Sequence, residues 1–278
     1  MSSAKGNRKD ATYAFAENIV ATQFEDIPPK VVKVTKDDIL DTIGVALSGS
    51  STAGISALME LIREWGGKGE STVLVFGDKV PAVNAALVNA TMAHSDDFDD
   101  AYDLNLTHTG ATTVLPALAI AERLGKVSGK DLITALALGQ DMALRMSSYL
   151  GINHGLHYSV VYGYFGGTAV VAKLLGLSEE QTVSAFGIAY SQLSGTLQAV
   201  EDGSLTKRLQ AGFSARGAVL SALLAQKNYE GSKDNIEGRC GFINVYGEGQ
   251  SDIEALTADL GKTFYSIYLG FKPYPTGR

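Results

Sequence analysis

The stretch from Tyr158 to Gly176, "YSVVYGYFGGTAVVAKLLG", decides the fold class. It has the length and spacing of a helix, and glycine and alanine recur along it. Small residues at helical spacing allow the axes of neighbouring helices to approach closely. The stretch therefore predicts an interior helix packed on other helices, not a surface amphipath.

Most of the remaining chain has the same character. Similar helical runs cover residues 35–50, 53–67, 111–125, 128–151 and 178–195. In the first run, the spacing predicts Thr35 as the N-cap with Asp38 at the third helical position, and Gly49 as the end. The β-branched run 72–76 predicts one short strand or hairpin before a helix that begins at Pro81. We therefore expect a mainly α, compact helical domain with at most a short β-hairpin.

Composition restricts the class of protein. The chain has 278 residues, 45% of them hydrophobic, and a net charge of −7, so it repels polyanions and nucleic acid is not an expected partner. No apolar run reaches the roughly 18 residues that a membrane span needs, and the N-terminus lacks the apolar segment of a signal peptide. The single cysteine, Cys240, excludes an internal disulfide. A soluble cytoplasmic protein without membrane contact is expected.

One segment departs from this apolar regularity. The stretch "MAHSDDFDDAYDLNLTHTG", Met92 to Gly110, carries five aspartates between two histidines. If the preceding helix continued through it, like charges would stack at a cost of roughly 0.2–0.5 kcal/mol per pair. The cluster is compatible with a solvated acidic turn that caps the next helix, with a divalent cation site, or with acid–base catalysis. It lacks the spacing of a calcium loop.

Histidines and cations supply further candidates. All four histidines lie in the middle of the chain, and His154 and His157 occupy a glycine-flanked loop before a helix, which favours proton transfer. For each one, a merely hydrogen-bonded histidine is the alternative. Lys207 and Arg208 open a helix whose N-terminus, with these charges, would bind a carboxylate or phosphate. Lys272 is a second candidate anion contact. A solvated basic face and an ordinary loop lysine are the alternatives.

Several motifs together resemble those of the MmgE/PrpD family. They are "HSDDFDDAY" with "THTGATTVLPALAIAE", "GLHYSVVYGYFGGTAVVAKLLGLSEEQ", "AFGIAYSQLSG", "EDGSLTKRLQAGFSARG", "EGRCGF" and "FKPYPTGR". They occur in order over essentially the whole chain. The family includes 2-methylcitrate dehydratase, cis-aconitate decarboxylase and iminodisuccinate epimerase.

The resemblance implies an architecture. Residues 1–270 would form the helical domain of the family, and residues 271–278 would begin the connection to a smaller α+β lid that this sequence lacks. Active sites in the family lie between the two domains, and its members are homodimers joined through their helical domains. No metal or organic cofactor is implied.

The resemblance also assigns site residues. The family's site aspartate falls on Asp97, its two histidines on His108 and His157, and its two lysines on Lys207 and Lys272. The histidines would serve as general acid and base, and the lysines would anchor substrate and stabilise negative charge. The aspartate would orient a histidine or act as a base.

Three more positions are candidate substrate contacts. They are Arg208, Ala101 and Gln210. Gln210 stands where many members carry histidine, and Ala101 stands where a threonine often follows the aspartates, so substrate contacts would differ here.

The expected function is a cofactor-independent lyase of the dehydratase type. It would act on a small di- or tricarboxylate such as 2-methylcitrate, by proton abstraction next to a carboxylate. The alternatives are an epimerase or isomerase, a decarboxylase of the same family, and a truncated helical scaffold without activity.

Overall fold

The computed structural model describes residues 10–105 and 107–276. It is 61% helical, and its strands form only short pairs, which confirms the predicted mainly α class. The α-helices are α1 (Ala11–Ala21), α2 (Pro29–Gly49), α3 (Ile55–Trp65), α4 (Ala82–Ala93), α5 (Gly110–Leu124), α6 (Gly129–Tyr149), α7 (Tyr158–Leu175), α8 (Glu179–Tyr190), α9 (Gln198–Glu201), α10 (Thr206–Gln226), α11 (Phe242–Val245) and α12 (Ile253–Thr257), with two 3₁₀ turns, η1 (Phe24–Asp26) and η2 (Tyr265–Tyr268).

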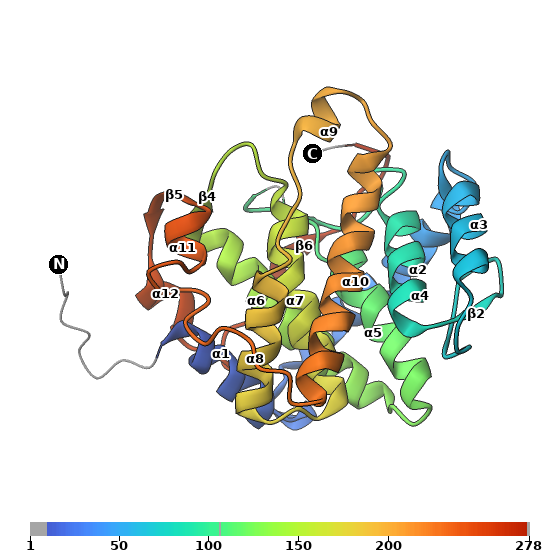
Figure 1. Ribbon diagram of the computed structural model, residues 1–278. Helices are drawn as coiled ribbons and strands as arrows, with labels where there is room; N and C mark the ends of the chain where they lie inside the picture. Colours follow the sequence, from blue (N-terminus) through green and yellow to red (C-terminus); the bar gives the residue numbers. More distant parts are fainter. Residues whose placement is uncertain (1–9, 106, 277–278) are drawn as a thin grey trace.

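Helix α7 lies at the centre of the bundle, as the opening stretch predicts. It packs against α5, α6, α8 and α10, and every residue from Ser159 to Ala172 is buried (Figure 1). A Cβ atom on Gly166 would lie 2.7 Å from the carbonyl oxygen of Gly139 and 2.8 Å from the Cβ of Ala143. The absence of a side chain at this position therefore allows α6 and α7 to approach closely.

The runs predicted around α7 correspond to helices α5, α6 and α8, but the predicted start of α2 is wrong. This helix begins six residues before Thr35, at Pro29, because proline is well suited to the first helical position. Thr35 and Asp38 are instead buried inside the helix, where Asp38 accepts a hydrogen bond of 2.5 Å from Nε2 of Gln140. The predicted end at Gly49 is confirmed.

The described strands form three antiparallel pairs. The predicted hairpin is confirmed as β1 (Ser71–Thr72) with β2 (Lys79–Val80). The other pairs are β3 (Ala101–Tyr102) with β6 (Leu269–Gly270), and β4 (Leu150–Ile152) with β5 (Gly247–Ser251). The β3–β6 pair fastens the segment before Lys272 to the loop after α4.

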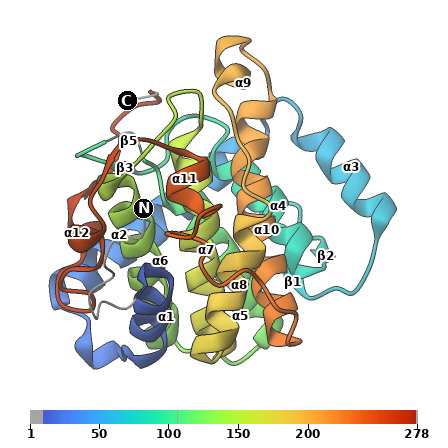
Figure 2. The same ribbon diagram turned by 60° about the vertical axis from the view of Figure 1, so that its left-hand side comes forward.

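The periphery separates into two sides. Helix α3 and the β1–β2 hairpin lie on one side of the bundle, and α11, α12 and the β4–β5 pair lie on the opposite side (Figure 1). The turned view shows α1 and α8 side by side at the front (Figure 2). No helix among the described residues is both long and apolar enough to cross a membrane.

Candidate active site

The acidic segment is a loop, not a continuation of a helix. Helix α4 ends at Ala93, His94 is its C-cap, and the like-charge stacking that a longer helix would impose does not arise. Asp100 accepts hydrogen bonds from the backbone N–H groups of Thr109 and Gly110, both at 2.8 Å. This aspartate therefore caps the start of α5, as one of the sequence alternatives predicts, but Asp99 and Asp100 are buried and not solvated as that alternative expected. Asp97 has a φ of +52°, a strained conformation for a residue with a side chain.

Histidines from separate elements meet beside this loop. The ring centroid of His94 lies 5.4 Å from that of His157 and 6.1 Å from that of His108. His157 is the N-cap of α7, and His108 lies two residues before the start of α5. The exposed fractions are 2% for His94, 8% for His108 and 7% for His157, so His94 lies deepest.

Each of these imidazoles has an acceptor at Nδ1. The pairs are His94 with Oδ2 of Asp99 at 2.7 Å, His108 with the backbone oxygen of Asp100 at 2.6 Å, and His157 with Oε1 of Gln210 at 3.0 Å. Gln210 also donates from Nε2 to the carbonyl of Thr196, which directs its amide oxygen toward His157. In the neutral state, all three rings therefore carry hydrogen on Nδ1 and a lone pair on Nε2.

Lysines border the same group. The ammonium of Lys207 forms an ion pair with the carboxylate of Asp97. Lys272 lies 3.1 Å from the backbone oxygen of Asp97 and 3.3 Å from Oδ1 of Asp99, and its side chain is 1% exposed. Asp99 therefore joins His94 to Lys272.

Burial and charge set the protonation states. Burial, with His94 and Lys207 nearby, lowers the pKa of His157 to about 3, although Gln210 opposes the shift. Burial also lowers the pKa of His94, against the opposing carboxylate of Asp99. Burial alone would raise the pKa of Asp99, but the surrounding histidines and Lys272 hold it well below the ordinary value. The surroundings therefore favour the ionised form of Asp99 and the neutral forms of His94 and His157.

Helix ends add to the positive potential. Helices α5, α7 and α10 all begin at the histidine and lysine positions, so their N-terminal dipole ends are directed toward the same region. With two lysines, this region favours an anion with more than one carboxylate. Among the described residues, no group of three or more histidine, cysteine or acidic side chains could hold a metal ion.

The structure brings together the five positions that the resemblance assigns to catalysis. The expected contact between Asp97 and a histidine is not observed, because Asp97 pairs with Lys207 and the histidine contact belongs to Asp99. Gln210 lies directly behind His157. Ala101 is buried in strand β3 opposite Gly270.

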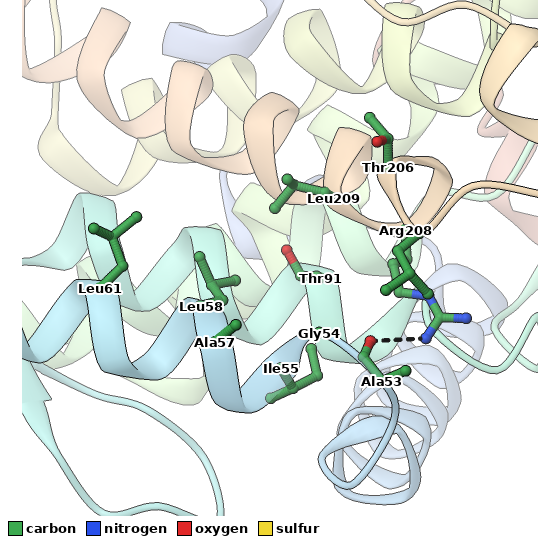
Figure 3. A pocket seen from close by; sticks show the side chains of 11 residues that line it. Ala53, Gly54, Ile55, Ala57, Leu58, Leu61, Thr91, Thr206, Arg208 and Leu209 are labelled. Carbon is green, nitrogen blue, oxygen red and sulfur yellow. Dashed lines mark hydrogen bonds between the residues drawn. The ribbon is translucent and has the colours of Figure 1, made fainter.

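Arg208 lies elsewhere. Its guanidinium donates to the carbonyl of Ala53 at 3.2 Å, and its side chain lines an apolar cavity of about 310 Å³ between α3, α4 and α10 (Figure 3). The leucines Leu58, Leu61 and Leu209 line the same cavity. The structure therefore does not place Arg208 with the histidines.

The sequence assigned no site role to two residues of the group, His94 and Asp99, although His94 is one of the four histidines whose positions favour proton transfer. Both stand in the acidic segment, but nothing in the spacing distinguishes Asp99 from the neighbouring aspartates. The available signal was the position of His94 directly after an apolar helix. A rigid helix holds a polar residue at its end in a fixed position.

The fold and the site define a mainly α domain with a buried group of histidines, lysines and an aspartate. The model of the MmgE/PrpD N-terminal domain matches residues 13–254, and the chain belongs to this family.

The chain is 30% identical to a cis-aconitate decarboxylase of Aspergillus terreus over 98% of the chain and 58% of the relative. It is 31% identical to a cis-aconitate decarboxylase-like protein of Aspergillus oryzae, over 89% of the chain and 54% of that protein. The human cis-aconitate decarboxylase is 28% identical over 96% of the chain and 56% of its own length. The chain thus spans less than two thirds of these relatives.

Proposed function

We propose that this chain carries the helical part of the active site of a cofactor-independent lyase that acts on a small di- or tricarboxylate. The observation that supports the proposal most directly is the group of buried imidazoles bordered by Lys207 and Lys272. Reactions next to a carboxylate place negative charge on the substrate oxygens in the transition state. Fixed lysines and helix N-termini stabilise such charge without reorganisation.

The proposed roles follow from the geometry. Lys207 and Lys272 would hold substrate carboxylates, with Lys207 exchanging its contact to Asp97 for one to the substrate. His108 and His157 would face the substrate with their Nε2 atoms and transfer protons. Gln210 would hold His157 in the required tautomer, as the orienting member of a catalytic group does.

The relatives favour one reaction within this class. All three curated relatives named above are cis-aconitate decarboxylases or decarboxylase-like. We therefore propose decarboxylation of a cis-aconitate-like tricarboxylate ahead of the dehydration of 2-methylcitrate that the motifs alone suggested. Both reactions need an electron pair next to a carboxylate to be stabilised and a proton to be moved.

Proton NMR tests the proposal. The purified protein is incubated with cis-aconitate, 2-methylcitrate and citrate, with His157→Gln as the inactive variant and His154→Gln as the control, since His154 is an exposed histidine outside the group. We expect new vinyl signals from cis-aconitate that depend on His157 and not on His154. Olefinic product from 2-methylcitrate alone would assign a dehydratase. A folded protein that neither binds nor converts any of these acids would contradict the proposal.

The homodimer that the resemblance implies stays a prediction. Size-exclusion chromatography with light scattering measures it directly, and a mass near twice 29.3 kDa is the expected result.

A further inference from the structure

His94 presents a buried nitrogen without a partner. Its Nδ1 is satisfied by Asp99, but Nε2 is fully buried and makes no hydrogen bond. A buried polar atom left unpaired costs about 1–3 kcal/mol, so a native structure rarely keeps one without a role. The nearest rings, those of His108 and His157, belong to the group to which the proposed function assigns proton transfer.

The acceptors behind the three rings differ in charge. His157 is backed by the neutral amide of Gln210, and His108 by a backbone carbonyl. Only His94 is backed by a carboxylate, that of Asp99. A carboxylate at Nδ1 stabilises the imidazolium form, whereas a neutral acceptor does so much less.

We propose that His94 is the general acid of the site, with Nε2 as the proton-donating atom and Asp99 as its positioning residue. The assignment rests on the proposed lyase function. In the decarboxylation of cis-aconitate, the bond from the methylene carbon to its carboxylate breaks and releases carbon dioxide, and its electron pair forms a double bond to the central carbon. The electron pair of the former double bond moves to the carbon next to a remaining carboxylate. The proton on Nε2 of the charged His94 moves to that carbon, and His94 regains a proton from solvent.

The charged groups around His94 agree with this role. Asp99 faces it from the loop, Lys272 from the C-terminal segment and Lys207 from α10, with His108 and His157 before α5 and α7. Burial, with Lys207 and His108 nearby, lowers the pKa of His94 in the free protein, although Asp99 opposes the shift. A polycarboxylate bound to the lysines would neutralise them and raise the pKa of His94, so that the acid is charged when substrate is present.

When the surroundings of two titratable groups shift their pKa values apart, one group can act as the acid and the other as the base. Burial and its neighbours lower the pKa of His157 to about 3, which leaves it as a neutral hydrogen-bonding group or base. The carboxylate-backed His94 then supplies the proton.

The test uses His94→Gln and Asp99→Asn, with His154→Gln as the matched control. We expect His94→Gln to lower kcat by about 10²–10⁴-fold with KM changed only a few fold, because it removes a proton donor and no substrate anchor. Asp99→Asn removes the carboxylate that raises the pKa of His94, so the alkaline limb of its kcat profile should move to lower pH. A merely structural role for Asp99 would lower the amplitude and leave the position of that limb unchanged. Retention of more than half of kcat in a folded His94→Gln variant overturns the assignment.

Histidine ring NMR provides a readout that needs no turnover. Ring ¹⁵N shifts of the wild-type protein, assigned with the same variants, are followed with and without added citrate. We expect His94 to become protonated at Nε2 on binding while His157 stays neutral. Protonation of His157 with His94 unchanged overturns the inference, even if the protein proves to be a lyase. Failure of every acid to be turned over, with His94 protonated on binding, would contradict the lyase proposal and retain the charge assignment of His94.

Discussion

At the scale of single residues, the site is defined by the hydrogen-bond acceptor at Nδ1 of each imidazole. A carboxylate, a carbonyl and an amide oxygen occupy the Nδ1 side of His94, His108 and His157 in turn. The same kind of side chain therefore has a charged partner at His94 and neutral partners at His108 and His157. The strained backbone of Asp97 belongs to this arrangement, because its carbonyl receives both Lys272 and the backbone N–H of Thr276.

The low pKa of His157 predicts that the free energy of unfolding depends on pH. Its pKa is about 3 in the folded protein and 6.5 ordinarily, so between these values the unfolded chain binds a proton that the folded chain does not. Stability then falls as the pH is lowered, by about 1.4 kcal/mol per unit. From pH 7 to pH 5, the wild-type protein should lose roughly 2 kcal/mol more than His157→Gln.

Urea unfolding of both proteins at the two pH values measures this difference. Other titrating groups are common to the two chains and largely cancel. Equal losses for wild type and variant would show that His157 is not held neutral.

At the scale of elements, helix contacts are set by small residues. Replacing Gly166 in α7 by alanine would force its Cβ against the backbone of Gly139 and against Ala143, neither of which can yield like a long side chain. We expect Gly166→Ala to destabilise the protein by about 1–3 kcal/mol. Gly44→Ala is the matched control, since Gly44 is also inside a helix but has no atom within 4 Å of the added Cβ. It should be neutral or stabilising by up to about 1 kcal/mol.

Thermal and urea unfolding of the two variants measures this difference in stability. If Gly166→Ala were as stable as Gly44→Ala, close approach of α6 and α7 would not be the reason for glycine at this position.

Most of what the sequence predicted correctly concerns these secondary-structure elements. Helices α5, α6, α7 and α8 were predictable because their apolar spacing and their ending glycines or capping serines are local. The start of α2 was not, since Thr35 and Asp38 imitate a cap while facing the core. The strand pairs β3–β6 and β4–β5 are too short for periodicity to indicate.

At the scale of the whole molecule, buried charges hold the C-terminal segment in place. Arg145 in α6 is 1% exposed and pairs with Asp141 at 2.7 Å. It also donates to the carbonyls of Ala258 and Thr263, both at 2.7 Å. These contacts position the segment that carries Lys272 into the site.

Arg145→Met should therefore cost about 3–5 kcal/mol, because it leaves the buried carboxylate of Asp141 without its positive partner and several carbonyls unpaired in the interior. Arg63→Met is the control, since its partner Asp78 is at 2.8 Å but the Arg63 side chain is 53% exposed, so the expected cost is much smaller than that of Arg145→Met. Urea unfolding gives both values, and limited proteolysis should cut the Arg145→Met variant first after residue 258. Similar costs for the two variants would contradict this description of Arg145.

Contacts at this scale explain what the sequence did not predict of the site. The five assigned residues came from motifs, and their types agree with the chemistry. The link from Lys272 through Asp99 to His94 spans most of the chain and depends on β3 and β6 pairing, which no local pattern contains. Arg208 follows Lys207 directly, but successive side chains on a helix point in different directions, so Arg208 lies toward α3.

We infer that this group of histidines transfers a proton to carbon during turnover of a polycarboxylate. The most direct measurement is the deuterium content of the product formed from cis-aconitate in D₂O, followed by NMR and mass spectrometry. We predict one deuterium per carbon dioxide released in the wild-type protein, and a large loss of turnover in His94→Gln. Turnover without deuterium uptake, or the absence of both binding and turnover in the folded protein, would contradict the account.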